Sequence, residues 1–568
     1  MKRITFGTPE KHVPSRYCKG FNYVEKPVNY PVDEIEFFVN ARGTNLVLPL
    51  YEDEQIYGMG LQLKQFNHRG RKLTCRVNSD PVSATGDSHA PVPFFVSTRG
   101  YGIYVDTARY AEFYFGSSKL LKQTVRNTEA KIADNTEELY TVRAQGLSNI
   151  SIQIPLAQGV DIYIIEGENL TDVIAQYNML SGGGCDVPEW GLEPIYRCYT
   201  KFCQDDILRF AKQFKEKDIP IGIIGLEPGW QTRAYSCSYV WSDERYPDHL
   251  GLIKELKDMG YHINLWEHVF THPTSPIYND IVKYGGNYAV WEGCVPDLSI
   301  PEARKIFADH QRKIISEGID GFKLDECDSS DYTRGWSFPN MSEFPSGMDG
   351  EQYHNMLGVL YMQTMLEALG DTPTLSEVRS AGALSASYPF VLYSDLYDHK
   401  DFIRGLASSG FSGILWTPEV RVTGSKQELL RRLQSNIFSV QCLLNIWFWD
   451  NTPWANFDCE DEVRELLKLR YTLIPMLKKA FEQYKSKGIP PIRALVCDYT
   501  KDANTYNIDD QFIFCDKLIV APIANGMTGR DVYLPEGKWV DYFTKEPVEC
   551  GKFHVETDFI PVYEKVED

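Results

Sequence analysis

The sequence lacks the patterns that mark several common classes of protein. None of its 13 cysteines belongs to a Cys-x-x-Cys pair, so there is no zinc or thioredoxin-type motif. There is no glycine-rich phosphate loop of either standard form and no low-complexity tract. No apolar run approaches membrane-spanning length, and the first ten residues lack the apolar core of an export signal. We therefore expect a cytoplasmic globular protein with mostly buried free thiols and with no metal or other cofactor.

Positive charge is also scarce. The chain has 58 lysines and arginines against 78 aspartates and glutamates, a net charge of -20. Nucleic acids and anionic membranes would be repelled, so neither is expected as a partner, and an acidic substrate is disfavoured. The apolar fraction of 43% and the length of 568 residues suit a soluble protein of several domains.

Three regions differ in their hydrophobic pattern. Up to about Pro188 the chain shows alternating, strand-like segments, for example at 34–39, 102–106 and 150–154. After the break Ser181-Gly182-Gly183-Gly184, strand and helix patterns alternate up to Lys487. The pattern then returns to strands. We predict an N-terminal β-sandwich over residues 1–188, a (β/α)8 TIM barrel over 189–488 and a small C-terminal β-sandwich domain over 489–568.

Acids and indole rings follow most of the predicted barrel strands. These strands are expected at 194–199, 221–226, 261–266, 321–324, 374–378, 390–394, 412–416 and 445–448. Their ends carry Glu227, Trp230, Glu267, His268, Asp325, Glu326, Glu377, Arg379, Asp395, Trp416, Glu419, Trp449 and Asp450. Any one of these acids could be a helix cap or a solvated loop residue. Because all strand ends of a barrel open on one mouth, their repetition indicates a shared site.

The stretch Gly321–Asp328 is the centre of this pattern, because a buried strand there ends in three acids within four residues. Such a cluster requires a proton or a positive charge in the same space. Lys323 lies two residues before Asp325 and so on the same face of the strand, where its charge would keep Asp325 ionised. The alternative is that the acids cap the next helix.

A mouth lined with carboxylates and indoles suits a sugar, since carboxylates bind hydroxyl groups and aromatic rings cover the C–H face of a pyranose. Hydrolysis of a glycosidic bond requires two carboxyl groups in different environments. Asp325 and Asp395 could provide that pair.

Several motifs resemble those of glycoside hydrolase family 31, the retaining α-glycosidases, over nearly the full length. They are Tyr57-Gly58-Met59-Gly60, Ser88-His89, Pro93-Phe94-Phe95, Asp297–Ala303, Phe322–Glu326, Arg379-Ser380-Ala381, Val520-Ala521-Pro522 and Val532–Trp539. The resemblance implies that Asp325 is the nucleophile and Asp395 the acid/base. Asp398 is the alternative acid/base, because the segment from Asp395 to Trp416 is about one helical turn shorter than is usual in the family. Asp398 could equally cap a helix.

The predicted substrate-binding residues are Glu227, Trp230, Trp266, Glu267, Lys323, Arg379 and Trp416. The resemblance implies that Arg379 donates hydrogen bonds to the sugar and that Trp266 and Trp416 form pocket walls. The segment after the nucleophile, with Asp328, Asp331 and Trp336–Pro345, is expected to be a pocket wall, a leaving-group platform or a hydrophobic plug.

Two departures from the family bear on the sugar. Glu227 stands where the family's glucosidases present an aspartate to the 4-hydroxyl, and 447–451 replaces a histidine after the last strand. An α-galactosidase is therefore the first expectation, with α-glucosidase second and α-xylosidase third. A sulfonated sugar is disfavoured, because no additional basic cluster is evident.

Two other classes of function remain open from the sequence. One is a sugar-binding barrel without catalysis, and the other is a metal-dependent lyase or isomerase. The expected partner is an oligosaccharide or another α-glycoside, and the sequence leaves open whether the chain forms homo-oligomers.

Overall fold

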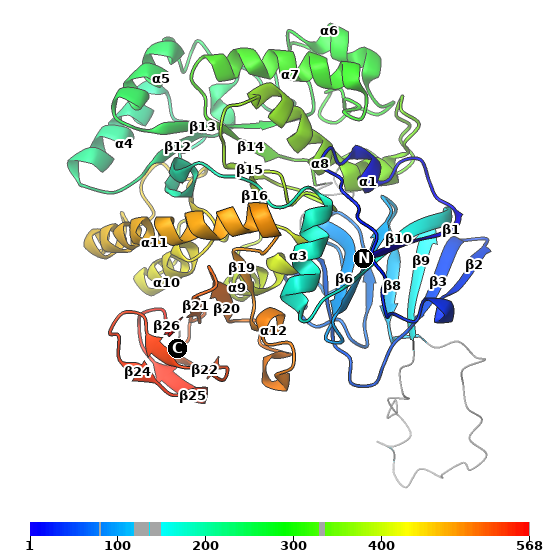
Figure 1. Ribbon diagram of the computed structural model, residues 1–568. Helices are drawn as coiled ribbons and strands as arrows, with labels where there is room; N and C mark the ends of the chain where they lie inside the picture. The colour runs from blue at the N-terminus through cyan, green and yellow to red at the C-terminus, as the bar shows by residue number, and fades with distance from the viewer. Residues whose placement is uncertain (79–80, 119–135, 137–148, 329–334, 567–568) are drawn as a thin grey trace.

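The computed structural model describes residues 1–78, 81–118, 136, 149–328 and 335–566; Asp331 lies outside these ranges. Figure 1 shows an antiparallel sandwich at the right, a parallel barrel at the upper left and a group of smaller sheets at the lower left, with helix α11 (Glu460–Lys487) passing between the last two. Among the described helices, none combines the length and the apolar character that crossing a bilayer requires.

The N-terminal region forms two five-stranded antiparallel sheets. In spatial order the first contains β1 (Lys2–Thr8), β10 (Gln158–Glu166), β7 (Tyr101–Asp106), β6 (Pro91–Ser97) and β4 (Ile56–Gly60), and the second contains β2 (Glu36–Asn40), β3 (Gly43–Pro49), β9 (Asn149–Pro155), β8 (Glu112–Phe115) and β5 (Lys72–Thr74). Their inward residues, such as Leu46, Phe95, Ile103 and Ile152, form one apolar core between the sheets. The expected β-sandwich is therefore present.

The central region forms one parallel sheet of eight strands that closes into a barrel. In spatial order these are β16 (Phe390–Leu392), β15 (Ser376–Val378), β14 (Gly321–Asp325), β13 (His262–His268), β12 (Ile223–Leu226), β11 (Pro194–Arg197), β18 (Cys442–Asn445) and β17 (Glu419–Val420). Leu392 of β16 pairs in parallel with Trp416, and the chain runs on from Trp416 into β17. The two edges of the sheet thus meet, and the predicted (β/α)8 barrel is confirmed.

Two barrel strands differ in position from the sequence-based prediction. Ser409–Ser412 forms a short 3-10 helix that ends at Gly413 in the left-handed region (φ 68°), so the seventh strand begins later than expected. The eighth strand begins earlier, at Cys442, because the buried run Cys442–Asn445 forms the strand while Trp447 and Phe448 lie exposed beyond its end.

Helices surround the barrel. They include α4 (Gln204–Glu216), α5 (His249–Asp258), α7 (Pro301–Ser316), α8 (Gly350–Leu369), α9 (His399–Ser408) and α10 (Lys426–Ile437), with α3 (Leu170–Leu180) between the sandwich and the barrel. Helices α4, α9 and α10 are strongly amphipathic, while α8 is buried along most of its length. Side chains alternate along each strand, so one set enters the barrel and the other packs against these helices.

The C-terminal region contains a six-stranded and a two-stranded sheet. The first has the order β19 (Ile492–Ala494), β20 (Phe512–Phe514), β21 (Leu518–Val520), β26 (Val562–Lys565), β23 (Trp539–Asp541) and β24 (Pro547–Val548), and the second pairs β22 (Gly529–Leu534) with β25 (Gly551–Glu556). Leu495, Ile519, Val532 and Trp539 are members of their shared core.

The segment Tyr57–Gly60 of strand β4 fastens the sandwich to the rest of the chain. The Tyr57 ring stacks on Phe411 at 5.2 Å, and its hydroxyl donates to the Tyr506 carbonyl at 2.9 Å. The Gly60 N–H donates to Ser412 Oγ at 3.0 Å. Gly60 has φ 85°, and a Cβ there would lie 1.9 Å from the Ala90 carbonyl, so only glycine fits.

Candidate active site

The floor of the barrel mouth is a buried network of charged and amide groups. Arg197, at the end of β11, is fully buried, and its Nε donates to Glu227 Oε1. Its Nη1 donates to Asn264 Oδ1 at 2.7 Å and to Glu377 Oε2 at 3.2 Å. Lys323 Nζ lies 3.3 Å from Glu227 Oε2. Because each buried charge has an opposite charge beside it, this floor is rigid and closed.

Asp325 ends β14 with its carboxylate in the pocket. Trp266 Nε1 donates to Asp325 Oδ2 at 2.7 Å, and the Glu326 N–H donates to Oδ1 at 2.9 Å. Burial raises the pKa of Asp325, but the charges of Arg379 and Lys323 and the indole hydrogen bond outweigh it and hold the pKa below the ordinary value. Asp325 is therefore ionised and fixed in orientation, and Lys323 contributes as predicted.

Arg379 connects three carboxylates. Its Nε donates to Asp328 Oδ2 and its Nη2 donates to Asp395 Oδ2, each at 2.7 Å, while Nη1 lies 3.8 Å from Asp325 Oδ1. His89, from the sandwich, places Nδ1 at 3.4 Å from the same Asp328 oxygen. The two predicted catalytic carboxylates thus contact different nitrogens of one buried guanidinium.

Asp395 follows β16 and is the more accessible carboxylate of the pair, with 46% of its side chain exposed. Its Oδ1 lies 3.1 Å from Arg421 Nη2, in addition to the contact with Arg379. Burial opposes ionisation, but these two arginines hold the pKa of Asp395 well below its usual range. In the unliganded pocket Asp395 is therefore a carboxylate, poised as a base rather than as an acid.

Glu326 is the second carboxyl group beside Asp325. It is buried, its φ of 54° lies in the left-handed region, and Tyr235 Oη donates to its Oε1 at 3.1 Å. Burial, followed by the charge of Asp325, raises the pKa of Glu326 to about 8. The three-acid cluster is thus stabilised by both means expected from the sequence, a proton on Glu326 and the positive charge of Arg379.

Glu227, Lys323, Asp325, Glu326 and Asp395 line a pocket of about 510 Å³ at the C-terminal ends of the strands. This volume is within the range of small-molecule sites. The floor is formed by Glu227, Trp266 and Lys323, each at most 4% exposed. The mouth is bordered by Tyr235, Trp336 and Trp447, which are 50%, 42% and 38% exposed. The pocket therefore has a polar, closed end and an aromatic rim.

Four predicted substrate-binding residues, Trp230, Glu267, Arg379 and Trp416, do not line the pocket. Arg379 is buried and contacts the lining carboxylates Asp325 and Asp395. Trp230 is buried and donates its Nε1 to the Trp266 carbonyl, and Trp416 is buried and donates to the Phe402 carbonyl. Glu267 faces the helix layer, where the Tyr361 hydroxyl donates to it at 2.7 Å. Strand alternation explains this correction, since Trp266 points into the barrel and its neighbour Glu267 must point out.

Asp398 occupies the N-cap of α9, where it accepts from the Asp401 N–H at 3.0 Å. The capping role that the sequence left open is the one observed. The structure brings Asp395, not Asp398, into the pocket with Asp325.

Sequence reasoning missed Arg197, Tyr235, Arg421 and Trp447. Arg197 gave a usable signal, because an arginine inside an otherwise apolar strand needs a buried partner. The other three lie in loops after strands, where no periodicity marks an inward side chain.

No group of three or more His, Cys, Asp or Glu side chains among the described residues is arranged to hold a metal ion. The pocket itself is lined by carboxyl groups, two arginines, a lysine and aromatic rings.

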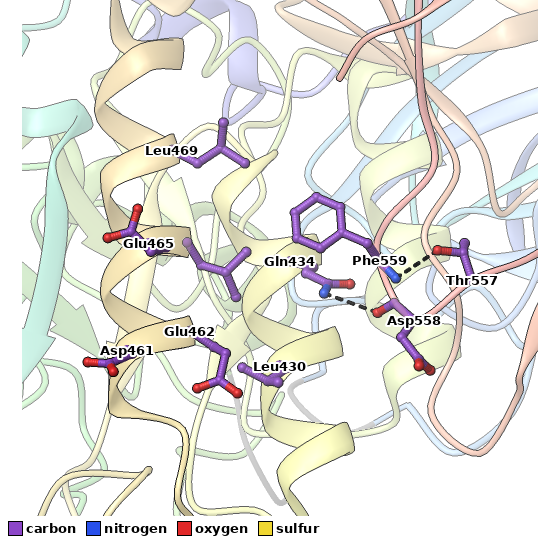
Figure 2. A pocket seen from close by; sticks show the side chains of 10 residues that line it. Leu430, Gln434, Asp461, Glu462, Glu465, Leu469, Thr557, Asp558 and Phe559 are labelled. Atoms are coloured by element: carbon purple, nitrogen blue, oxygen red, sulfur yellow. Dashed lines mark hydrogen bonds between the residues drawn. The ribbon is translucent and has the colours of Figure 1, made fainter. Parts of the chain in front are cut away.

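A second pocket, of about 600 Å³, lies away from the barrel mouth between α10, α11 and residues 557–559 (Figure 2). Its wall includes Leu430, Leu466, Leu469 and Phe559. Its acids pair with surface cations, as Asp461 does with Arg464 at 2.5 Å. It contains no buried charge network.

The fold and the barrel-mouth site together define a carbohydrate-cleaving hydrolase of the barrel type. Residues 186–480 match the TIM-barrel domain of glycosyl hydrolases family 31, residues 488–567 match that family's C-terminal domain, and residues 39–113 match its N-terminal galactose mutarotase-like domain. The chain belongs to glycoside hydrolase family 31, and it is a glycosidase.

Individual relatives are distant but cover most of the chain. An α-xylosidase of Emericella nidulans is 25% identical over 92% of this chain and 68% of its own length. An α-glucosidase 2 of Bacillus thermoamyloliquefaciens is 25% identical over 90% of this chain and 67% of its own. A dextranase of Flavobacterium johnsoniae, solved with glucose, superposes with a TM-score of 0.80 at 22% identity over 93% of this chain and 67% of that one.

Proposed function

We propose that this protein is a retaining exo-α-glycosidase that releases a terminal α-linked xylose or glucose. The observation that carries the proposal is Asp325, which is held ionised at the closed end of a sugar-sized pocket by Trp266, Arg379 and Lys323. A carboxylate that is fixed and ionised is what attack on an anomeric carbon requires.

Asp395 supplies the second carboxyl group. In the first step Asp325 attacks the anomeric carbon and Asp395 gives a proton to the leaving oxygen; in the second, Asp395 takes a proton from water, which then releases the sugar. To hold a proton, Asp395 must lose part of its contact with Arg379 or Arg421. A sugar hydroxyl that accepts a hydrogen bond from Arg379 would do this, and it would raise the pKa of Asp395 as substrate binds.

The closed floor supports exo action. Arg197, Glu227 and Lys323 block passage beyond the deepest sugar, so only a chain end fits. Because the mouth is open and aromatic, the leaving group points toward Tyr235, Trp336 and Trp447. A single terminal residue is therefore cleaved at a time.

The relatives compared above favour xylose or glucose over the galactose expected from the sequence. The galactose expectation rested on Glu227 and on the replacement of a histidine by residues 447–451. Within that segment Trp447 lines the pocket, but it is 38% exposed and lies at the mouth, and Glu227 is fixed by Arg197 and Lys323. Glu227 thus offers a fixed hydrogen-bond acceptor in the floor. Residues 447–451 do not alter the shape of the floor, so the reason for expecting an axial 4-hydroxyl is removed.

The test is hydrolysis of 4-nitrophenyl α-xyloside, α-glucoside, α-galactoside and α-N-acetylgalactosaminide by wild type, Asp325→Ala and Asp395→Ala. We expect turnover of the xyloside or glucoside and its loss in Asp325→Ala. Azide should restore activity to Asp395→Ala by giving a glycosyl azide with retained configuration, because it attacks the glycosyl-enzyme. Any azide product of Asp325→Ala should have inverted configuration, because azide then takes the place of the nucleophile in a single displacement. Preference for the galactoside would overturn the sugar assignment, and full activity of Asp325→Ala would overturn the mechanism.

A further inference from the structure

Two arginines at the pocket mouth have no role in the chemistry described so far. Arg233 and Arg245 both line the pocket, on the segment that follows β12. Within the described parts of the chain, no hydrogen bond or ion pair joins either guanidinium to another residue. We infer that Arg233 and Arg245 form a recognition site for a negatively charged group on the leaving-group half of the substrate. This inference rests on the proposed function and names the class of substrate.

Backbone hydrogen bonds on both sides of Arg245 hold this residue in place. Its N–H donates to the Ser242 carbonyl at 3.1 Å, and its own carbonyl accepts from the Gln204 N–H at 2.9 Å, so the backbone is held on both sides. A Cβ on Gly229 would lie 2.7 Å from Arg245 Nη1. Glycine at position 229 therefore leaves the space in which the half-buried guanidinium lies against the pocket wall.

The other pocket cations are already paired. Lys323 lies against Glu227, Arg379 bonds Asp328 and Asp395, and Arg421 contacts Asp395 and Glu419. Most of their donors neutralise protein carboxylates; Arg379 Nη1 and Arg421 Nε are buried without a hydrogen-bond partner in the described part of the chain. Arg233 and Arg245 are the pocket-lining cations whose donors are open to a ligand, and a guanidinium fork matches a carboxylate, sulfate or phosphate.

Both arginines lie at the mouth of the pocket, where the leaving group is expected, and not at the floor. Arg233 is exposed and lies two residues before Tyr235, whose ring is 50% exposed at the mouth. The terminal sugar occupies the floor beside Asp325, more deeply than either arginine. Because the whole chain carries a charge of -20, an anion is not attracted at long range, so its binding depends on these local contacts. The sequence shows no additional basic cluster, but the fold brings together at this rim two arginines that are 12 positions apart in the chain.

The test uses three disaccharides that differ only in the leaving group. They carry the preferred terminal sugar α-linked to glucose, to glucuronate or to glucose 6-phosphate, which separates a carboxylate from a phosphate. We compare kcat/KM for wild type, Arg245→Gln and Arg233→Gln, with Arg16→Gln as a control that removes an exposed positive charge elsewhere. We expect wild type to prefer one anionic substrate by about tenfold or more, a preference that Arg245→Gln removes and Arg233→Gln reduces.

Two results would overturn the inference and leave the glycosidase assignment intact. These are equal kcat/KM for the neutral and both anionic substrates, or an equal loss on all three in Arg245→Gln. Activity on the neutral substrate separately tests the proposed function. If none is cleaved, calorimetric binding to Asp325→Asn still decides the inference, because tighter binding of an anionic disaccharide supports it and equal or weaker binding refutes it. The preference should also shrink as salt is raised from 20 to about 300 mM.

Discussion

Two of the larger pockets among the described residues are similar in volume and differ in chemistry. The pocket at the barrel mouth measures about 510 Å³, and the pocket between α10, α11 and residues 557–559 measures about 600 Å³ (Figure 2). The first contains Asp325 and Lys323, which are less than 10% exposed. In the second, the side chains of Asp461 and Glu465 are 87% and 72% exposed and pair with lysine or arginine of their own helix.

Size and apolar lining therefore do not identify the functional site. Exposed ion pairs leave pKa values nearly unchanged and contribute little energy. Buried charges must be arranged so that each is compensated, and that arrangement fixes ionisation states and directions. The following predictions test whether this difference is what separates the catalytic pocket from the other.

The largest effect is expected from Arg379→Met. This change leaves Asp325, Asp328 and Asp395 without their shared cation, so the pKa of Asp325 rises and the nucleophile loses charge. We expect kcat/KM to fall about 10²- to 10³-fold and the acid limb of the pH profile to move to higher pH. Arg379→Lys should recover only part of the loss, since an ammonium cannot make the same fork of hydrogen bonds. A wild-type profile in Arg379→Met, with unchanged circular dichroism, would refute the role of this arginine.

A smaller effect, on pH dependence, is expected from Arg421→Gln. Arg421 helps to hold the pKa of Asp395 low, so its removal raises that pKa. Because the protonated acid then persists to higher pH, the alkaline limb of kcat/KM should move up by about one pH unit. The measurement is a pH–rate profile. Glutamine is chosen because its amide keeps a hydrogen-bond donor near the buried Glu419. An alkaline limb that stays in place would show that Arg421 does not set the pKa of Asp395.

A change in stability without loss of activity is expected from Glu267→Gln. Burial raises the pKa of Glu267 from the ordinary 4.5 to about 8. Its contribution to stability is therefore fully present below about pH 4.5 and is lost as pH rises through about 8. Between pH 5 and 9 the Tm of wild type should fall about 2–4 °C further than that of the variant. A parallel fall in both proteins, or a large loss of kcat, would contradict the placement of Glu267 outside the pocket.

The smallest effect is expected from Glu465→Gln in the second pocket. Its carboxylate is 72% exposed and only 3.5 Å from Lys468. We expect kcat/KM to change less than about twofold and Tm to remain near that of wild type. A marked loss of activity would mean that the second pocket is coupled to catalysis, and the contrast drawn above would fail.

Most of the fold could be predicted because its signals are local. The strands predicted at 102–106 and 150–154 are present as Tyr101–Asp106 and Asn149–Pro155, because alternating apolar residues and flanking turn residues mark them. The seventh barrel strand was misplaced, because its two-residue length is set by pairing with Cys442–Asn445 rather than by its own composition.

The sequence predicted the site residues well where acids follow a strand. It predicted them less well where the question was whether a side chain points into the pocket or away from it. Asp325, Asp395 and Lys323 reach the pocket, while Glu267 and Trp416 look equally suitable in sequence and point elsewhere. Arg197 and Glu227, which form an ion pair, are 30 positions apart in the chain. Asp395 is 16 positions from Arg379 and 26 positions from Arg421, the two arginines that it contacts. Such contacts depend on how distant segments pack together, so no single segment of the sequence predicts them.

His89 reaches from the sandwich to within 3.4 Å of Asp328, and its Nε2 lies 2.8 Å from Ser394 Oγ, one residue before Asp395. The barrel by itself therefore does not complete the support of its own catalytic groups. Asp328 and Ser394 follow barrel strands β14 and β16, so this one imidazole joins the sandwich region to both segments that carry the catalytic carboxylates. A barrel separated from the sandwich would lack this support, so the two regions have to be associated for the site to be complete.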